Sequence, residues 1–406
     1  MTLGMYQAVD LKKPVGICAF MPRLIRGRRL KHLLVLFWLG MLSACGGSDN
    51  VQPPTPLSDI VNTLEVDRSW SKNTGAGSGK YFLRLVPFVE DDAVFVADHQ
   101  GKISARSVES GKSLWETDID LPVTAGVNGG VEMLAVGTDE GTIVALSQKE
   151  GKEIWRQVLS SQVTAISRAS NGMLVVRSGD GYLYGMEAAT GNIVWKLNRT
   201  VPALSLHTQS TPIVSRGVVL VGLDDGRLMM VSLTDGGVLW EKAIAVPGGR
   251  TELDRMVDID GVIALIGNVV YVGTYQGKIV AVDAAKGRLL WQQKASSVNG
   301  LTVDGDTLFY TDENSAVWAL DRRSGASLWK QEALKFRRLT APVALDHVIV
   351  VADYEGYLHW LDRDSGKILA RSQADKHGVL APPVKIGSDL LVLGEGGGLS
   401  RWRLDQ

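Results

Sequence analysis

Short apolar runs separated by glycine-containing turns recur along the chain. Residues 134–138 and 142–146 are β-rich runs on either side of an acidic-glycine turn, a pattern typical of a β-hairpin. A second turn at 149–152 leads into residues 153–156, which predict an outer strand, and runs such as 212–214 predict an inner strand. Because helical periodicity is missing, the pattern predicts an all-β chain made of four-stranded units.

The units repeat with a fixed internal spacing. A glycine is followed fourteen residues later by a tryptophan, and a second glycine lies ten residues after the first. The pairs are Gly101/Trp115, Gly141/Trp155, Gly181/Trp195, Gly226/Trp240 and Gly277/Trp291, with degenerate copies at Ser315/Trp329 and Gly356/Ala370. The second glycines are Gly111, Gly151, Gly191, Gly236, Gly287, Gly325 and Gly366. A period of roughly 40 residues indicates a β-propeller, in which neighbouring blades cover each other's apolar faces.

The number of blades follows from the repeat starts. They step by 40, 40, 45, 51, 38 and 41 residues, and one more step of 41 reaches Gly397, which makes eight starts. The chain ends too soon after Gly397 for an outer strand, whereas residues 65–70 look like an outer strand without a blade. We therefore predict an eight-bladed β-propeller of four-stranded antiparallel blades over residues 61–406, with the ring closed by the N-terminal strand. The repeat tryptophans, Trp70 included, should pack between blades rather than bind a cofactor.

The N-terminal region has the pattern of an export signal. A basic run at 23–31 precedes an apolar run at 33–42, and residues 42–45 read Leu-Ser-Ala-Cys. This ending resembles the lipobox of bacterial lipoproteins, which implies acylation of Cys45 after removal of residues 1–44. Met21 is an alternative translation start, because the signal is complete without the residues before it. Residues 45–60 would then be a lipidated cysteine and a flexible, proline-rich tether.

Composition restricts the chemistry of the mature chain. Without residues 1–44 the chain has 36 basic and 43 acidic residues, a net charge of about −7, which argues against a nucleic-acid partner. Cys45 is the only cysteine left, so neither an intramolecular disulfide nor a catalytic thiol is expected. The six histidines are scattered, and the Asp-Gly pairs lack the spaced carboxylates of a calcium loop. We predict no catalytic residues, no metal site and no cofactor.

The repeat is similar to the tryptophan-docking repeat of pyrroloquinoline-quinone (PQQ) dehydrogenases, most clearly at residues 281–291 and 319–329. Those enzymes are eight-bladed propellers, so the resemblance supports the fold. They typically hold adjacent cysteines over the quinone and build the pocket with insertions. This chain has a single mature cysteine and is short of those insertions, and a fold alone does not carry a function.

The combination of a lipobox with a bare propeller resembles the BamB family, lipoproteins of the β-barrel assembly machinery. The resemblance covers residues 42–406 and is most specific at 202–207, 251–260 and 353–358. It implies an outer-membrane, lipid-anchored protein whose propeller faces the periplasm and binds the POTRA domains of BamA through the first two of these regions. Other subunits of the machinery and nascent outer-membrane proteins are further implied partners. The family commonly has arginine where this chain has His207.

Spacing marks the same two regions independently. The distance from the tryptophan position of a repeat, with Ala370 counted as one, to the next start is 24–27 residues in five cases, but 31 after Trp195 and 37 after Trp240. Long loops on a rigid scaffold are common sites of function. One insertion offers Leu204 and Leu206, and the other offers charges. We expect an apolar anchor beside a charged rim, a typical protein-docking patch. The candidate partner-binding residues are Leu204, Leu206, His207, Arg255, Asp258 and Asp260. The alternative is two ordinary long loops with the leucines folded inward.

The predicted function is that of a non-enzymatic scaffold that assists assembly and insertion of β-barrel proteins into the outer membrane. Two alternatives remain open from the sequence: an exported PQQ-dependent dehydrogenase and a periplasmic ligand sensor. An absorbance spectrum with added quinone and calcium would separate the enzyme from the other two, and affinity capture of a partner would separate scaffold from sensor.

Overall fold

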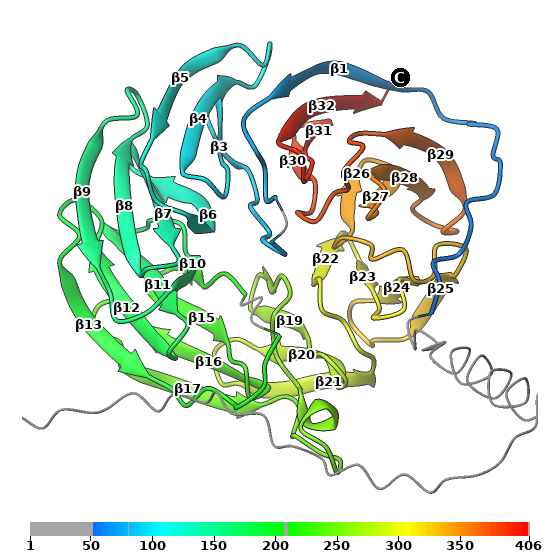
Figure 1. Ribbon diagram of the computed structural model, residues 1–406. Helices are drawn as coiled ribbons and strands as arrows, with labels where there is room; N and C mark the ends of the chain where they lie inside the picture. The colour runs from blue at the N-terminus through cyan, green and yellow to red at the C-terminus, as the bar shows by residue number, and fades with distance from the viewer. Residues whose placement is uncertain (1–51, 80, 207–209, 405–406) are drawn as a thin grey trace, which may run out of the picture. The chain divides into compact units, whose positions relative to one another are not determined.

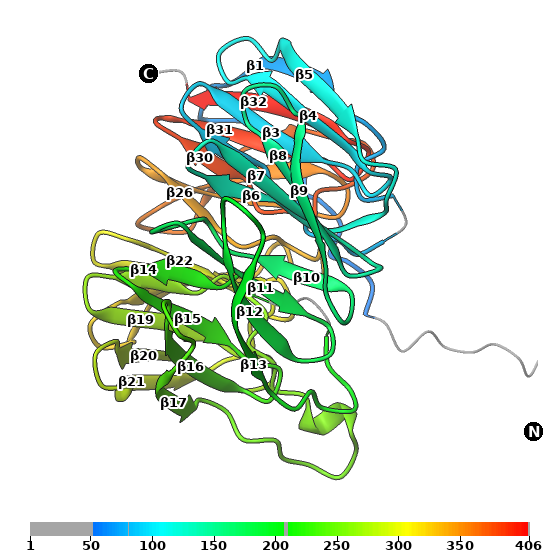
Figure 2. The same cartoon turned by 90° about the vertical axis from the view of Figure 1, so that its left-hand side faces the viewer.

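Eight antiparallel sheets of four strands each stand as blades around a central axis (Figure 1). The computed structural model describes residues 52–79, 81–206 and 210–404, and within them it contains 32 strands and one 3-10 helix. The predicted eight-bladed, all-β propeller is confirmed. Each blade runs from an inner strand to an outer one, and the edge-on view in Figure 2 shows the blades stacked around the ring.

The strand bounds follow the repeat. Blade 1 contains β2 (Phe88–Glu90), β3 (Ala93–Ala97), β4 (Lys102–Ser107) and β5 (Ser113–Asp118). Blade 2 contains β6 (Val123–Gly130), β7 (Met133–Thr138), β8 (Thr142–Ser147) and β9 (Glu153–Val158). Blade 3 contains β10 (Val163–Ile166), β11 (Met173–Ser178), β12 (Tyr182–Glu187) and β13 (Ile193–Asn198). Blade 4 contains β14 (Ile213–Ser215), β15 (Val218–Gly222), β16 (Arg227–Ser232) and β17 (Val238–Ala243).

The second half of the ring has the same organisation. Blade 5 contains β18 (Ala264–Ile266), β19 (Val269–Gly273), β20 (Lys278–Asp283) and β21 (Arg288–Lys294). Blade 6 contains β22 (Leu301–Asp304), β23 (Thr307–Thr311), β24 (Val317–Asp321) and β25 (Ser327–Gln331). Blade 7 contains β26 (Val343–Leu345), β27 (Val348–Ala352), β28 (Tyr357–Asp362) and β29 (Ile368–Gln373). Blade 8 contains β30 (Val384–Ile386), β31 (Asp389–Leu393), β32 (Gly398–Leu404) and β1 (Val66–Asn73). The 3-10 helix η1 (Leu253–Arg255) lies between β17 and β18.

Burial explains why the strands differ in sequence. The two middle strands of a blade are covered on both faces by the neighbouring blades, so β7 and β8 are buried along almost their whole length. The outer strand β9 alternates between exposed and partly covered residues, because one of its faces meets solvent. The middle strands therefore read as continuous apolar runs, which is the pattern that the sequence shows at residues 134–138 and 142–146.

The N-terminal strand closes the ring as predicted. β1 pairs antiparallel with β32 through seven residue pairs, from Val66 with Leu404 to Asn73 with Gly398, and Trp70 lies opposite Arg401. The last blade is thus completed by a strand more than 300 residues away in the sequence, which leaves no free edge on β32.

A tryptophan clasp joins most neighbouring blades. The ring of each repeat tryptophan packs on the second glycine of the next blade, and its indole Nε1 donates a hydrogen bond of 2.7–3.1 Å to a carbonyl there. A Cβ atom on any of these seven glycines would come within 2.4–2.9 Å of the indole, and all seven have positive φ. Glycine is required for both reasons. The predicted inter-blade role of the seven tryptophans is confirmed.

Candidate functional site

The first long insertion, between β13 and β14, carries one exposed leucine and one partly covered leucine. Leu204 is 42% exposed, whereas Leu206 is intermediate in burial and the intervening Ser205 is buried. The backbone N–H of Leu206 donates a 3.3 Å hydrogen bond to Oδ2 of Asp258 in the second insertion. The prediction of an exposed leucine pair holds for Leu204 and only partly for Leu206.

The second insertion, between β17 and β18, has an exposed tip at residues 246–255. Thr251 and Asp254 cap its turn reciprocally: Asp254 N–H donates to Thr251 Oγ1 at 3.1 Å, and Thr251 N–H donates to Asp254 Oδ2 at 3.1 Å. Hydrogen bonds to the Asp254 carboxylate from the side chain of Thr251, and then from its backbone N–H, hold the pKa of Asp254 below its usual value. Arg255 pairs with Glu252 at 3.0 Å, and Gln276 Nε2 donates to the carbonyl of Leu253 at 3.2 Å. The tip, which projects beyond the blades in Figure 2, is thus fixed by local bonds rather than by burial.

The base of the same insertion, residues 256–263, lies between blades 4 and 5 and is buried except at Val262. Ile259 and Ile263 belong to the apolar cluster that joins the two blades. Asp258 is 1% exposed and Asp260 is 4% exposed. The prediction that these two aspartates lie in an exposed charged rim is therefore wrong. They lie among apolar residues of an inward-running segment, and of the three charged candidate residues Arg255, Asp258 and Asp260 only Arg255 lies at the surface.

Three carboxylates meet at this base. Asp224, in the turn after β15, forms a buried ion pair of 3.0 Å with Arg177 of β11. Asp260 is coupled electrostatically to Arg84. Burial, followed by the charges of Asp260 and Asp224, raises the pKa of Asp258 to about 7. Asp258 is therefore largely protonated below neutral pH, although it accepts the hydrogen bond that joins the two insertions.

Sequence reasoning missed the apolar residues of the tip. Val246 and Leu253 are well exposed, and Leu253 is 59% exposed on η1. The available signals were the Pro-Gly-Gly stretch at 247–249, which keeps the chain away from the blades, and a single leucine within a polar run. Among the described residues, the two insertions therefore expose the large apolar side chains of Leu204, Val246, Leu253 and Val262.

A cavity of about 270 Å³ lies at the axis of the ring. The inner strands β6 and β10 line it, together with residues 82–86 and 260–263. Arg84 reaches across it and donates to Asn299 Oδ1 at 2.6 Å and to the carbonyl of Val298 at 3.3 Å. Across residues 52–79, 81–206 and 210–404, no three His, Cys, Asp or Glu side chains are grouped as metal ligands.

Two predicted site residues, Cys45 and His207, lie outside the described residues, and so does the signal at 1–44. Within the described part of the chain, no helix is long and apolar enough to cross a membrane.

Comparisons with known proteins agree with this architecture. The profile of the family described as "Outer membrane protein assembly factor BamB" matches residues 99–331. The BamB of Pseudomonas aeruginosa is 44% identical over 370 residues, covering 91% of this chain and 97% of that protein. The BamB of Escherichia coli K12 is 33% identical over 384 residues, covering 91% and 98%.

Solved structures give the fold. The crystal structure of BamB from Moraxella catarrhalis superposes with a TM-score of 0.76 at 24% identity, covering 84% of this chain and all of that one. A quinohemoprotein alcohol dehydrogenase from Pseudomonas putida HK5 gives 0.67 at 12% identity, covering 86% and 78%.

The molecule is thus an eight-bladed propeller whose blades are joined by tryptophan clasps, and it shares the propeller fold with a quinohemoprotein alcohol dehydrogenase as well as with a BamB. Among such propellers, the chain belongs to the outer membrane protein assembly factor BamB family. Its relatives are named as assembly factors and not as enzymes, which agrees with the predicted lack of catalysis.

Proposed function

We propose that this chain is a lipid-anchored scaffold of outer-membrane protein assembly, with Cys45 acylated and the propeller facing the periplasm. It docks through its two insertions onto the periplasmic POTRA domains of BamA and holds them near the membrane while β-barrel proteins are inserted. The relatives' names support a role in outer-membrane protein assembly. The partner is the one that the resemblance to the BamB family implies, and the anchor is inferred from the lipobox.

The observation that carries the proposal is the joining of the two insertions. The Leu206 N–H to Asp258 bond ties the first insertion to the buried base of the second. Leu204 and Leu253 stay exposed, although most large apolar side chains of the chain are buried in the blades. Exposed apolar side chains on a rigid base are typical anchors of a protein interface, with Arg255 as a polar neighbour. In this proposal Asp258 and Asp260 position the insertions and do not contact the partner, and His207 adjoins Leu206 in sequence.

The docking proposal is tested by truncating the anchors. Leu204→Ala combined with Leu206→Ala should weaken binding to BamA POTRA domains about tenfold or more, which corresponds to ~1.4 kcal/mol. Leu253→Ala should weaken it separately. Matched controls are Leu114→Ala and Leu328→Ala, because both leucines are 56% exposed but lie on outer strands. Calorimetric titration gives the affinities and circular dichroism checks the fold. Wild-type affinity in a folded double variant would refute the docking site.

The anchor proposal has its own test. Cys45→Ser should abolish incorporation of radioactive palmitate in cells and leave a precursor or an unanchored product, because the mature chain has no other cysteine. Labelling that persists in this variant would show that the lipid is attached elsewhere.

A further inference from the structure

The segment before β1 is bound to the propeller along residues 55–64, which we term the strap. Thr63 N–H donates to the carbonyl of Leu369 in β29 at 2.8 Å. The side chain of Asn62 pairs with the backbone of Arg371, accepting from its N–H at 3.0 Å. Leu57 and Leu64 pack against apolar clusters of the propeller. The strap thus runs beside the outer strand of blade 7, and Figure 1 shows it in blue around that side of the ring. This part of the expected tether is not free.

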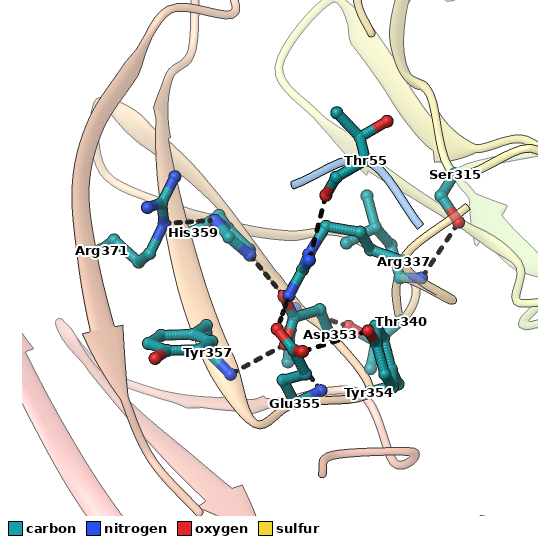
Figure 3. A network of polar contacts seen from close by, with 12 residues as sticks. Thr55, Ser315, Arg337, Thr340, Asp353, Tyr354, Glu355, Tyr357, His359 and Arg371 are labelled. Atoms are coloured by element: carbon teal, nitrogen blue, oxygen red, sulfur yellow. Dashed lines mark hydrogen bonds and ion pairs between the residues drawn. The ribbon is translucent and has the colours of Figure 1, made fainter. Parts of the chain in front are cut away.

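A buried arginine holds the far end of the strap. Arg337 is 2% exposed and donates to the carbonyl of Thr55 at 3.1 Å, to Asp353 Oδ2 at 2.8 Å, and to Glu355 (Figure 3). The N–H of Thr55 donates in turn to the carbonyl of Lys335 at 3.0 Å. Burial alone would lower the pKa of Arg337, but the bonds to Glu355 and Asp353 outweigh it and raise the pKa. Arg337 therefore stays charged. Asp353 and Glu355 hold its guanidinium in place, and the guanidinium also donates to the strap at Thr55.

A second arginine, Arg371, is linked to the carboxylate of Asp353 through His359. His359 lies within 2.9 Å of Asp353 Oδ2 through its Nε2, and Arg371 Nε donates to His359 Nδ1 at 3.4 Å. Burial lowers the pKa of His359, so the ring is neutral, which fits an Nδ1 that accepts a bond. Arg371 then donates to the carbonyl of Ser58 at 2.9 Å. Asp353, which is fully buried, therefore orients two arginines that each bind a strap carbonyl.

The backbone around Arg337 is strained. Phe336 and Arg338, on either side of it, have φ of 62° and 50°, which is costly for residues with a side chain. Two adjacent departures of this kind persist only where the surroundings hold them, and they mark sites at which a precise side-chain position is needed. The position achieved here is that of the Arg337 guanidinium against Thr55.

Topology places this attachment on a particular face of the ring. In an antiparallel blade, connections from an outer strand to the next inner strand share a face with the turns between the two middle strands. Arg337 lies in the β25–β26 connection and Asp353 in the β27–β28 turn. The two insertions are the β13–β14 and β17–β18 connections, so they lie on the same face, which we term the insertion face. In Figure 2 the start of the described chain and η1 emerge on the same side of the disc.

The strap also limits the reach of the anchor. Cys45 is ten residues from Thr55, which allows at most roughly 35 Å, whereas a chain free up to Val66 could span roughly 75 Å. The strap therefore shortens the free tether by about half and moves its exit from blade 8 to the boundary of blades 6 and 7.

We propose that the strap turns the insertion face toward the membrane, so that a lipid surface lies within the short reach of residue 45 on the side where the partner docks. The proposal rests on the acylation of Cys45 in the proposed function. In this arrangement the docking of the partner and the anchoring to the membrane take place on the same face of the disc. The bound partner is then held between the propeller and the bilayer surface.

The test uses the mature full-length chain with a lipid coupled by maleimide chemistry to Cys45, its only cysteine, so that cellular lipidation is not needed. A donor dye is introduced through an azide-bearing amino acid at Val246 on the insertion face, or at Lys286 in the β20–β21 turn on the opposite face. Both residues are exposed and lie in neighbouring blades. On vesicles with acceptor-labelled headgroups, we expect higher energy transfer from position 246 than from 286. Equal transfer, or higher transfer from 286, would overturn the proposal.

The strap itself is tested by Leu57→Asp combined with Thr63→Pro. These changes remove an apolar contact and the N–H that binds Leu369, and leave β1 and all propeller residues untouched. We expect amide exchange in residues 55–62 to rise about tenfold or more, and the difference between the two dye positions to vanish. Val61→Asp is the matched control, because Val61 is 88% exposed within the strap. A difference that survives release of the strap would overturn the proposal. Persistent palmitate labelling of Cys45→Ser would refute the cellular anchor alone.

Discussion

The junction between blades 7 and 8 differs from the other seven junctions of the ring. At the seven, a tryptophan docks on a glycine of the next blade, with an indole hydrogen bond of 2.7–3.1 Å. At the eighth, the tryptophan position holds Ala370, which is fully buried. Leu64 and Val66 from the strap and β1 pack there beside Trp360 and Trp402.

The difference has a topological cause. The docking glycine of a clasp lies in the turn between the third and fourth strands of the next blade. In blade 8 these strands are β32 and β1, the two ends of the chain, and no turn joins them. A tryptophan at position 370 would have no glycine to receive it. The N-terminal segment fills this space instead, so the segment that closes the ring also replaces the missing clasp.

The largest effect is expected from deleting residues 61–70, which removes most of the closing segment. The deletion exposes the edge of β32 and the apolar side of Trp402, and the junction has no tryptophan clasp to compensate. We expect a loss of about 5 kcal/mol or more in the free energy of unfolding, together with aggregation. Calorimetry on this variant and on a control that lacks residues 46–51 would decide. An unchanged melting temperature would mean that the ring closes in another way.

Breaking one clasp should cost less than opening the ring. Trp195, the most buried repeat tryptophan, packs on Gly236 and donates to the carbonyl of Leu233 at 2.8 Å. Trp195→Ala should lower the free energy of unfolding by about 3–5 kcal/mol, because it leaves a cavity between two blades. Leu239→Ala, at an exposed position of β17, is the control and should change little. Denaturant titration measures both. A small loss for Trp195→Ala would show that the clasps are redundant.

Adding a tryptophan at the eighth junction should destabilise rather than help. Ala370 is surrounded by Trp360, Trp402 and Leu64, so the indole of Ala370→Trp would displace them. We expect a loss of about 1–3 kcal/mol, the usual cost of overpacking. Denaturant titration against an Ala370→Gly control tests this. A gain in stability would mean that the junction does contain a receiving site for the ring.

The sequence predicts the regular part of this molecule well, and the physical reason is repetition. Each repeat has a glycine that receives one tryptophan and, four residues later, a position that usually holds the next docking tryptophan, so this recurring pair identifies the fold and the blade count. The missing tryptophan at Ala370 is visible in the same pattern, but its explanation needs the pairing of β1 with β32.

The insertions and the strap are predicted less well, because they occur once each. The length of the insertions is visible from the spacing. However, Leu253 and Asp258 lie in the same polar stretch of sequence, and only the fold shows that Leu253 is exposed and Asp258 buried. The strap at 55–64 reads as a proline-rich tether, because its partners Arg337 and Arg371 lie about 280–310 residues away. Whether Cys45 and His207 act as the resemblance implies stays a prediction.

The clasped junctions also differ from one another, because the junction of blades 4 and 5 contains the buried carboxyl of Asp258. The smallest expected effect is the pH dependence of stability that this carboxyl causes. The base of the second insertion lies beside blades 4 and 5, where Trp240 clasps Gly287, and it adds the buried carboxyl of Asp258 to that junction. In the unfolded chain this carboxyl ionises near its ordinary pKa, and in the folded chain only near 7, because of burial and then of Asp260 and Asp224. Between these values the folded state holds one more proton than the unfolded state. Stability therefore falls as the pH rises from about 4 to about 7 and levels off above that.

Asp258→Asn should remove this dependence. The amide oxygen can still accept the Leu206 N–H, while the charge beside Asp260 and Asp224 is absent. We expect the variant to be more stable than the wild type by about 1–2 kcal/mol at pH 8, with little difference at pH 5. Melting curves at both values check this, with Asp364→Asn as the control, since Asp364 is exposed in the turn between β28 and β29. A variant that is destabilised equally at both pH values would mean that the carboxylate itself holds the two insertions together. The docking patch would then depend on the charge of Asp258, and burying that charge would cost the wild type free energy of folding.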